Sequence, residues 1–185
     1  MSRTNIRPAV ATLALLAALG GVALAAQDRY SLQVPGGLAF SEFKGYQDWQ
    51  MIAVSHNGDM IATILGNPAM IAAFKAGIPG NGKPFPDGAK MAKIHWMAEK
   101  NSAQPGDPTV PGALHDVDFM EKDSTRFADS GGWGWAEFEY DTASDTFRPG
   151  NESDQPPQAH DAKCGFACHT IVRTKDYVFT AYPRR

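Results

Sequence analysis

The sequence predicts an α+β fold, an antiparallel β-sheet with flanking helices in one domain. Segments with the composition and alternation of strands outnumber segments with the pattern of a helix. Short turn-forming links join strand segments directly, and such links are typical of antiparallel pairing. Together the two observations favour the α+β class.

The first 25 residues have the pattern of a cleaved secretory signal peptide. Arg3 and Arg7 form a short basic region, an apolar stretch follows over residues 9–19, and Ala23-Leu24-Ala25 matches the A-x-A cleavage pattern. The apolar stretch is shorter than the roughly 20 residues that span a bilayer. We therefore expect secretion into an oxidising compartment, no membrane span after cleavage, and a single domain over residues 26–185. A retained anchor is the alternative.

The composition excludes some classes of partner. The formal net charge is −3, and no stripe of basic residues is present, so nucleic acid is not expected as a partner. No second apolar run in the sequence is long enough to cross a membrane. The chain is long enough for one domain with a buried core.

The first half of the mature chain predicts a short helical turn, a hairpin and a helix. Aromatic residues in residues 41–49 indicate the turn, and residues 49–56 and 60–67 have strand composition. Asn57-Gly58-Asp59 between them predicts a tight hairpin turn. A helix then follows over residues 68–77, with Asn67 as N-cap, Pro68 at its first position and Gly77 as its stop.

The second half predicts further strands. Residues 89–100 alternate imperfectly, with Met91, Lys93 and His95 on one face. Residues 117–123 have a weak strand pattern, and residues 131–141 have a clear one. The clear strand places four side chains on one face: Trp133, Trp135, Glu137 and Glu139. Polar loops are expected over residues 101–113 and 141–160.

The segment "CGFACH" holds the chain's two cysteines, Cys164 and Cys168, followed directly by His169. A disulfide would close a ring of three residues, which stabilises little. A zinc site would use Cys164, Cys168 and His169, with His160 as a fourth ligand, but this is not a common zinc spacing. The third hypothesis is a c-type haem, whose signature is C-x-x-C-H. Here the spacing is one residue longer, C-x-x-x-C-H.

Several segments in order resemble the cytochrome P-460 family over most of the mature chain. "GYQDWQMIAVSH" and "TILGN" are similar to its first strands, and "PFPDGAKMAKIHW" to its "FxDGTxxxKE" strand. "EKDSTRFADSGGWGWAEFEY" resembles its "KDxxRFA" block. "CGFACHTIVRTKDYVFTAY" resembles its haem-binding end, "CxxCH…TDxVFTxF".

The resemblance implies a periplasmic c-type haem protein, usually a homodimer, with haem packed on the sheet and bonded to Cys164 and Cys168. His169 would be the iron ligand. Lys93 matches the lysine that the enzymatic branch bonds to the haem. Asp118 or Asp116 lies near the place of a proton-relay carboxylate. The family's distal arginine is replaced, since Ile61 or Ala62 stands at its position.

Three functions remain open from the sequence. The first is an oxidoreductase acting on hydroxylamine or nitric oxide at an open five-coordinate haem, passing electrons to a soluble periplasmic electron-transfer protein. Lys93 and Asp118 would be its catalytic residues. The second is a gas-binding protein like cytochrome c′-beta, with an apolar distal pocket formed by Ala62 and Ile64. The third is an electron carrier whose iron takes a sixth ligand from His56, His95 or a methionine.

Overall fold

The computed structural model describes residues 26–35, 37–150 and 160–185, and side chains of the C-terminal helix from Gly165 onward. The predicted signal peptide, residues 1–25, lies outside the described residues. Among the residues that are described, no helix is both long enough and apolar enough to span a bilayer.

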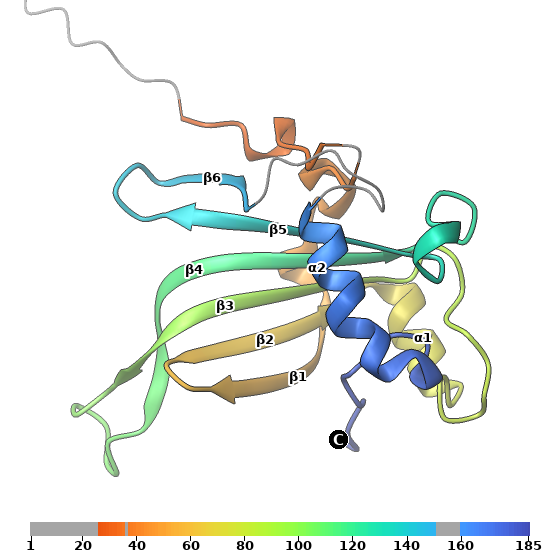
Figure 1. Ribbon diagram of the computed structural model, residues 1–185. Helices are drawn as coiled ribbons and strands as arrows, with labels where there is room; N and C mark the ends of the chain where they lie inside the picture. The colour runs from red at the N-terminus through yellow and green to blue at the C-terminus, as the bar shows by residue number, and fades with distance from the viewer. Residues whose placement is uncertain (1–25, 36, 151–159) are drawn as a thin grey trace, which may run out of the picture.

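Six strands form one antiparallel sheet whose order in space follows their order along the chain (Figure 1). The strands are β1 (Gln50–Asn57), β2 (Met60–Gly66), β3 (Lys90–Lys100), β4 (Thr109–Lys122), β5 (Trp133–Asp141) and β6 (Thr146–Pro149). Each strand therefore pairs with its neighbour in sequence, as consecutive antiparallel strands commonly do. The predicted α+β class with an antiparallel sheet is confirmed.

The helices are short and lie around this sheet. The α-helices are α1 (Pro68–Lys75) and α2 (His160–His169). The 3₁₀ helices are η1 (Arg29–Ser31), η2 (Phe40–Phe43), η3 (Tyr46–Asp48), η4 (Ala128–Ser130) and η5 (Thr170–Lys175). Figure 1 shows α2 crossing one face of the sheet.

The local predictions for the first half are confirmed. Gly58 adopts φ +60° in the turn between β1 and β2, a conformation that glycine reaches without steric cost. The Asn67 side chain accepts a hydrogen bond from the Met70 N–H at 2.9 Å and so caps α1. Gly77, at φ +86°, follows the last turn of α1.

The predicted loop over residues 101–113 is too long, because β4 begins at Thr109. Pro and Gly in "VPGA" suggested a loop, but this stretch pairs with the far end of β3. In the described chain, pairing of β4 with β5 starts only at Asp116. Pro111, which has no N–H to donate, therefore lies in an edge portion of β4, where strand proline is tolerated.

The loop predicted over residues 141–160 is likewise interrupted by a strand. β6 (Thr146–Pro149) pairs with the end of β5 through a tight turn at residues 142–145. A strand of four residues is too short for an alternating pattern to identify it. The weak pattern over residues 117–123 is, in contrast, the central part of the long strand β4.

The two faces of the sheet bury separate cores. One face packs against the N-terminal segment that carries η1, η2 and η3. Its cluster includes Phe40, Phe43, Ala92, Val117, Phe119 and Phe138. The other face packs against α1 and the C-terminal segment, and its cluster includes Ile64, Met91, Met120, Trp133, Trp135 and Val178. Alternation within each strand therefore decides which side chains face the C-terminal segment.

A buried ion pair fixes the C-terminal segment to the sheet. The Lys122 ammonium on β4 lies 2.8 Å from Asp176 Oδ1, and both side chains are almost fully buried. The other oxygen of Asp176 accepts a hydrogen bond from the Phe85 N–H at 2.7 Å. Lys122 also donates to the Gly131 carbonyl. Because each charge has further hydrogen-bond partners, the cost of its burial is offset.

Helix α2 approaches β5 closely at Gly165. A methyl group at Gly165 would lie 2.5 Å from Cγ of Trp135 and 2.7 Å from its Cβ. Both atoms are at the base of a bulky side chain, so neither can move away without shifting the strand or the helix. The absence of a side chain at Gly165 therefore permits this packing.

We expect Gly165→Ala to lower the melting temperature, although alanine gains up to about 1 kcal/mol of helix propensity over glycine. Overpacking against Trp135 costs about 1–3 kcal/mol and exceeds that gain. Thermal unfolding followed by circular dichroism measures the change. Ala167→Gly, on the exposed side of α2, is the control that measures propensity alone. A stabilised Gly165→Ala protein would contradict the close approach.

Candidate functional site

A cavity of about 550 Å³ lies between the sheet and the C-terminal segment. This size is within the range of ligand and cofactor sites in proteins. The floor comes from β1 to β5 and the opposite wall from α2 and residues 178–180. The lining includes Ile64, Met91, Lys93, Asp118, Met120, Trp135, Glu137, Cys168, His169 and Phe179.

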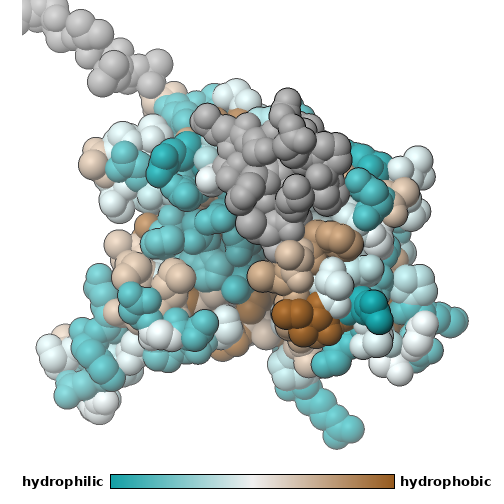
Figure 2. All heavy atoms as spheres, viewed as in Figure 1, coloured by the Kyte–Doolittle hydropathy of each residue, from teal (hydrophilic) through white to brown (hydrophobic). Residues whose placement is uncertain are grey.

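The cavity floor changes from apolar to charged along the strands. Strand register places the side chains in rows across the sheet. The first row is Met91, Met120 and Trp135. The next row is Ile64, Lys93, Asp118 and Glu137. The third row is Ala62, His95, Asp116 and Glu139. On the face in Figure 2, hydrophilic residues lie over the start of β4 and the end of β5, and strongly apolar residues gather over the C-terminal helices.

His169, the last residue of α2, lies at the cavity with its ring oriented by the backbone. Its Nδ1–H donates to the Tyr177 carbonyl oxygen at 2.5 Å. This leaves Nε2 as the nitrogen with a free lone pair. Burial lowers the pKa of His169, and the nearby Lys93 charge lowers it further, although the Tyr177 hydrogen bond opposes both effects. The imidazole is therefore neutral at neutral pH and can bind a metal.

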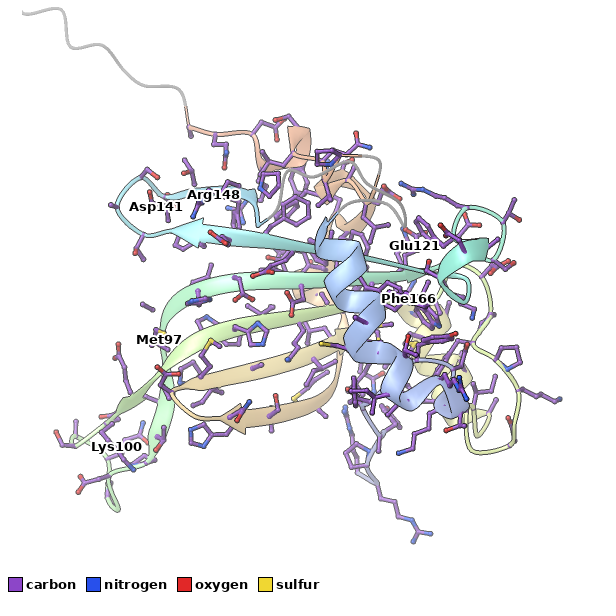
Figure 3. The ribbon with its side chains drawn as sticks, viewed as in Figure 1. Met97, Lys100, Glu121, Asp141, Arg148 and Phe166 are labelled. Carbon is purple, nitrogen blue, oxygen red and sulfur yellow. The ribbon has the colours of Figure 1, made fainter. Side chains whose placement is uncertain are left out.

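Aromatic rings surround this imidazole. The centroid of the Phe179 ring lies 5.0 Å from that of His169, and the Trp135 ring lies 5.5 Å away. Phe166, labelled on α2 in Figure 3, stacks on Tyr177 with centroids 6.0 Å apart. The indole Nε1 of Trp135 is buried and has no hydrogen-bond partner among the described residues. The cavity wall is therefore aromatic and largely apolar beside one metal-binding nitrogen.

The cysteines lie on the same helix as His169. Cys164 and Cys168 are four residues apart in α2, which places them on one helix face about one turn apart. The Cys168 thiol is free, exposed and at the cavity. The side chains of Cys164 and His160 lie outside the described ones, so the zinc hypothesis stays a prediction.

The structure brings Lys93 and Asp118 together at the same cavity. They are direct cross-strand partners on β3 and β4, and both line the cavity. The predicted grouping of Met91 and Lys93 on the cavity face is confirmed, while Ala92 and Ile94 pack on the opposite face against the N-terminal segment.

Asp116 lies one row away and is not part of the cavity lining. It is 4% exposed and hydrogen-bonded to His95 and His115. Burial acts to raise the pKa of Asp116, but the hydrogen bonds and charges of the two histidines outweigh it and hold the pKa below its ordinary value. Of the two aspartates considered for a proton relay, Asp118 is therefore the one that reaches the cavity.

The family resemblance implies a distal arginine on β2, but the residues near that position are apolar. Ile64 lines the cavity, and Ala62 is buried opposite His95 in the register. His56 is exposed on β1 and His95 is held by Asp116; neither is among the lining residues of the described cavity. Met91 and Met120 do line it. Sequence reasoning did not predict that the Tyr177 carbonyl orients His169 or that the Phe179 ring packs against it, because a backbone hydrogen bond and ring packing leave no local motif.

These residues fit a covalently bound haem c. The cavity combines a thiol, an imidazole with its Nε2 free, and an aromatic wall, and a c-type haem is held by such thiol and imidazole groups. Lys93 and Asp118 belong to the strand side of the same cavity, and His169 and Cys168 to its helix side.

Comparison with known proteins agrees with this donor set. No curated protein gives a significant match to the chain. The model of the family described as Cytochrome P460 matches residues 43–180, which cover β1 to β6, both α-helices and the whole cavity lining. This chain therefore belongs to the cytochrome P460 family, whose members are c-type haem proteins that bind haem c covalently.

Proposed function

We propose that this haem protein is an oxidoreductase that acts on hydroxylamine or nitric oxide at an open five-coordinate iron. The observation that carries the proposal is the cavity itself, which has an imidazole with a free Nε2 on one wall and Lys93 and Asp118 on the other. The bound haem supplies an iron that coordinates a small nitrogen ligand and exchanges electrons.

His169 is the proposed iron ligand, and Cys164 and Cys168 are the proposed thioether positions. The Tyr177 carbonyl fixes the His169 tautomer and ring orientation, as hydrogen-bond acceptors of metal-ligating histidines generally do. Phe179 and Trp135 pack beside the ring and limit its rotation.

Lys93 and Asp118 are the proposed catalytic residues. Lys93 is the proposed lysine of the haem cross-link that is typical of the family, and its place in the cavity lining, in the second row of the floor, supports this. Asp118 is the proposed acceptor of the protons that leave an oxidised nitrogen substrate. Its side chain is 42% exposed, so a proton can pass from it to solvent.

The setting of this reaction is also a proposal. The signal-peptide pattern and the family resemblance support a periplasmic location. They also support a homodimer and a soluble electron-transfer protein that removes electrons.

A gas-binding protein like cytochrome c′-beta is the second candidate. The observation that favours it is the apolar character of the floor near the expected arginine, where Ile64, Met91 and Met120 line the cavity. These three side chains admit nitric oxide, but none of them can orient a polar substrate as an arginine would. An electron carrier would need Met91 or Met120 as a sixth ligand.

Covalent attachment is tested by denaturing the purified protein and measuring its mass. We expect the wild-type mass to include one haem and the double variant Cys164→Ala/Cys168→Ala to lose haem on denaturation, since both thioether positions are gone. Ser55→Ala, which changes another cavity-lining residue, should retain it. Haem retained by the double variant would overturn the attachment assignment.

The cross-link is tested by Lys93→Arg, which keeps the positive charge but removes the primary amine. We expect peptide mass spectrometry to find haem bonded to a peptide containing Lys93 in the wild type and only to the cysteine peptide in the variant. Lys90→Arg is the control, because Lys90 lies on the opposite face and pairs with Glu121 at 3.1 Å. Identical haem-peptide patterns in wild type and Lys93→Arg would contradict the assignment.

Asp118→Asn tests the proton acceptor. We expect it to lower the rate of hydroxylamine oxidation by about 10²–10⁴-fold, the usual effect of losing a general base. Haem content and nitric oxide binding should not change. Glu139→Gln, one row away and paired with Arg148, should keep the wild-type rate. Nitric oxide binding by a wild-type protein that does not oxidise hydroxylamine would instead support the gas-binding function.

A further inference from the structure

We propose that His95, Asp116 and Asp118 form a second metal site, which binds a divalent first-row transition ion separately from the haem iron. This inference does not depend on the proposed oxidoreductase function, because the three residues lie beside the cavity on β3 and β4 and their ion binding can be measured without turnover.

The three side chains converge on one point. One ligand atom from each residue lies within 4.8 Å of the other two. Nδ1 of His95 is hydrogen-bonded to Oδ1 of Asp116 and lies 3.8 Å from Oδ2 of Asp118. A metal between them at ordinary ligand distances of about 2.0–2.2 Å requires only small side-chain rotations.

The strands pre-organise this arrangement. His95 and Asp116 are direct cross-strand partners, and Asp118 lies two residues farther along β4 on the same face. A site on paired strands is held more precisely than a site on loops. The His95 and Asp116 side chains are only 12% and 6% exposed, so they are not part of a solvated acidic surface.

The two carboxylate oxygens around one imidazole nitrogen favour a bound cation at this cluster. Nδ1 of His95 carries at most one hydrogen, yet two carboxylate oxygens approach it. A divalent ion can be coordinated by all three atoms at once. From outside the cluster, His115 Nδ1 contacts the remaining oxygen of Asp116 at 2.5 Å. Such an outer hydrogen bond is the usual support of a ligating carboxylate.

The donor set indicates the class of ion. One imidazole nitrogen and two carboxylate oxygens suit Zn²⁺, Mn²⁺ or Fe²⁺, whereas Ca²⁺ and Mg²⁺ prefer oxygen alone. Asp118 borders the cavity and is 42% exposed, which gives an ion a path to the site. Coordination through Oδ2 of Asp118 leaves its other oxygen able to accept a hydrogen bond.

The test uses haem-loaded protein without an affinity tag, treated with a chelator and then titrated with Zn²⁺ by calorimetry and with Mn²⁺ by electron paramagnetic resonance. We expect one ion per chain in addition to the haem iron. Asp116→Asn and Asp118→Asn should each weaken binding by about 100-fold. His115→Asn should weaken it by about 10-fold, as expected for a residue that supports a ligand. His56→Asn, an exposed histidine on β1, is the matched control and should bind as the wild type does.

Saturating Zn²⁺ should also raise the melting temperature of the wild type but not that of Asp118→Asn, since only a folded protein with the complete site gains from binding. Asp118 is partly exposed, so its conservative variant remains informative if Asp116→Asn fails to fold. The proposal would be overturned, leaving a hydrogen-bonded network, if the wild type bound no ion at millimolar concentration or if both aspartate variants bound the ion as tightly as the wild type does.

Discussion

The docking of the C-terminal segment on the sheet is the constraint on which the site depends. Gly165 lets α2 lie against Trp135, and the Lys122–Asp176 pair fixes the chain beyond η5. Between these two contacts the chain carries Cys168 and His169. The Tyr177 carbonyl that orients the His169 ring follows Asp176 directly. The ion pair therefore sets the position of the hydrogen-bond acceptor as well as that of the segment.

The sheet contributes the other half of the site through its register. Because side chains alternate along each strand, Met91 and Lys93 of β3 face the cavity, and Ala92 and Ile94 face the N-terminal core. A slip of one residue in β3 would exchange Lys93 for an apolar neighbour. The two separate cores oppose such a slip, since it would place charge in the cluster around Phe119.

The charged row next to the cavity brings the two proposed sites side by side. Asp118 borders the cavity on one side and the His95–Asp116 pair on the other. An ion held by these three residues would lie beside the haem cavity without occupying it. The residues near the position of the expected arginine are apolar. The charged groups on the floor of the described cavity are therefore Lys93, Asp118 and Glu137.

The sequence determined the local elements and the identity of the chemical groups. Asn67 and Gly77 bounded α1, the Asn57-Gly58-Asp59 turn fixed the first hairpin, and "CGFACH" predicted a haem-binding segment, because caps, tight turns and a ligand motif are encoded within a few residues. The sequence left the start of β4 and the whole of β6 unrecognised, since both are strands only through pairing with neighbours. The choice of Asp118 over Asp116 at the cavity, the orientation of His169 by Tyr177 and the convergence of His95 with two aspartates were decided by tertiary structure alone. Each of these depends on distances between strands or segments far apart in the chain, and such distances are set by packing and register rather than by local sequence.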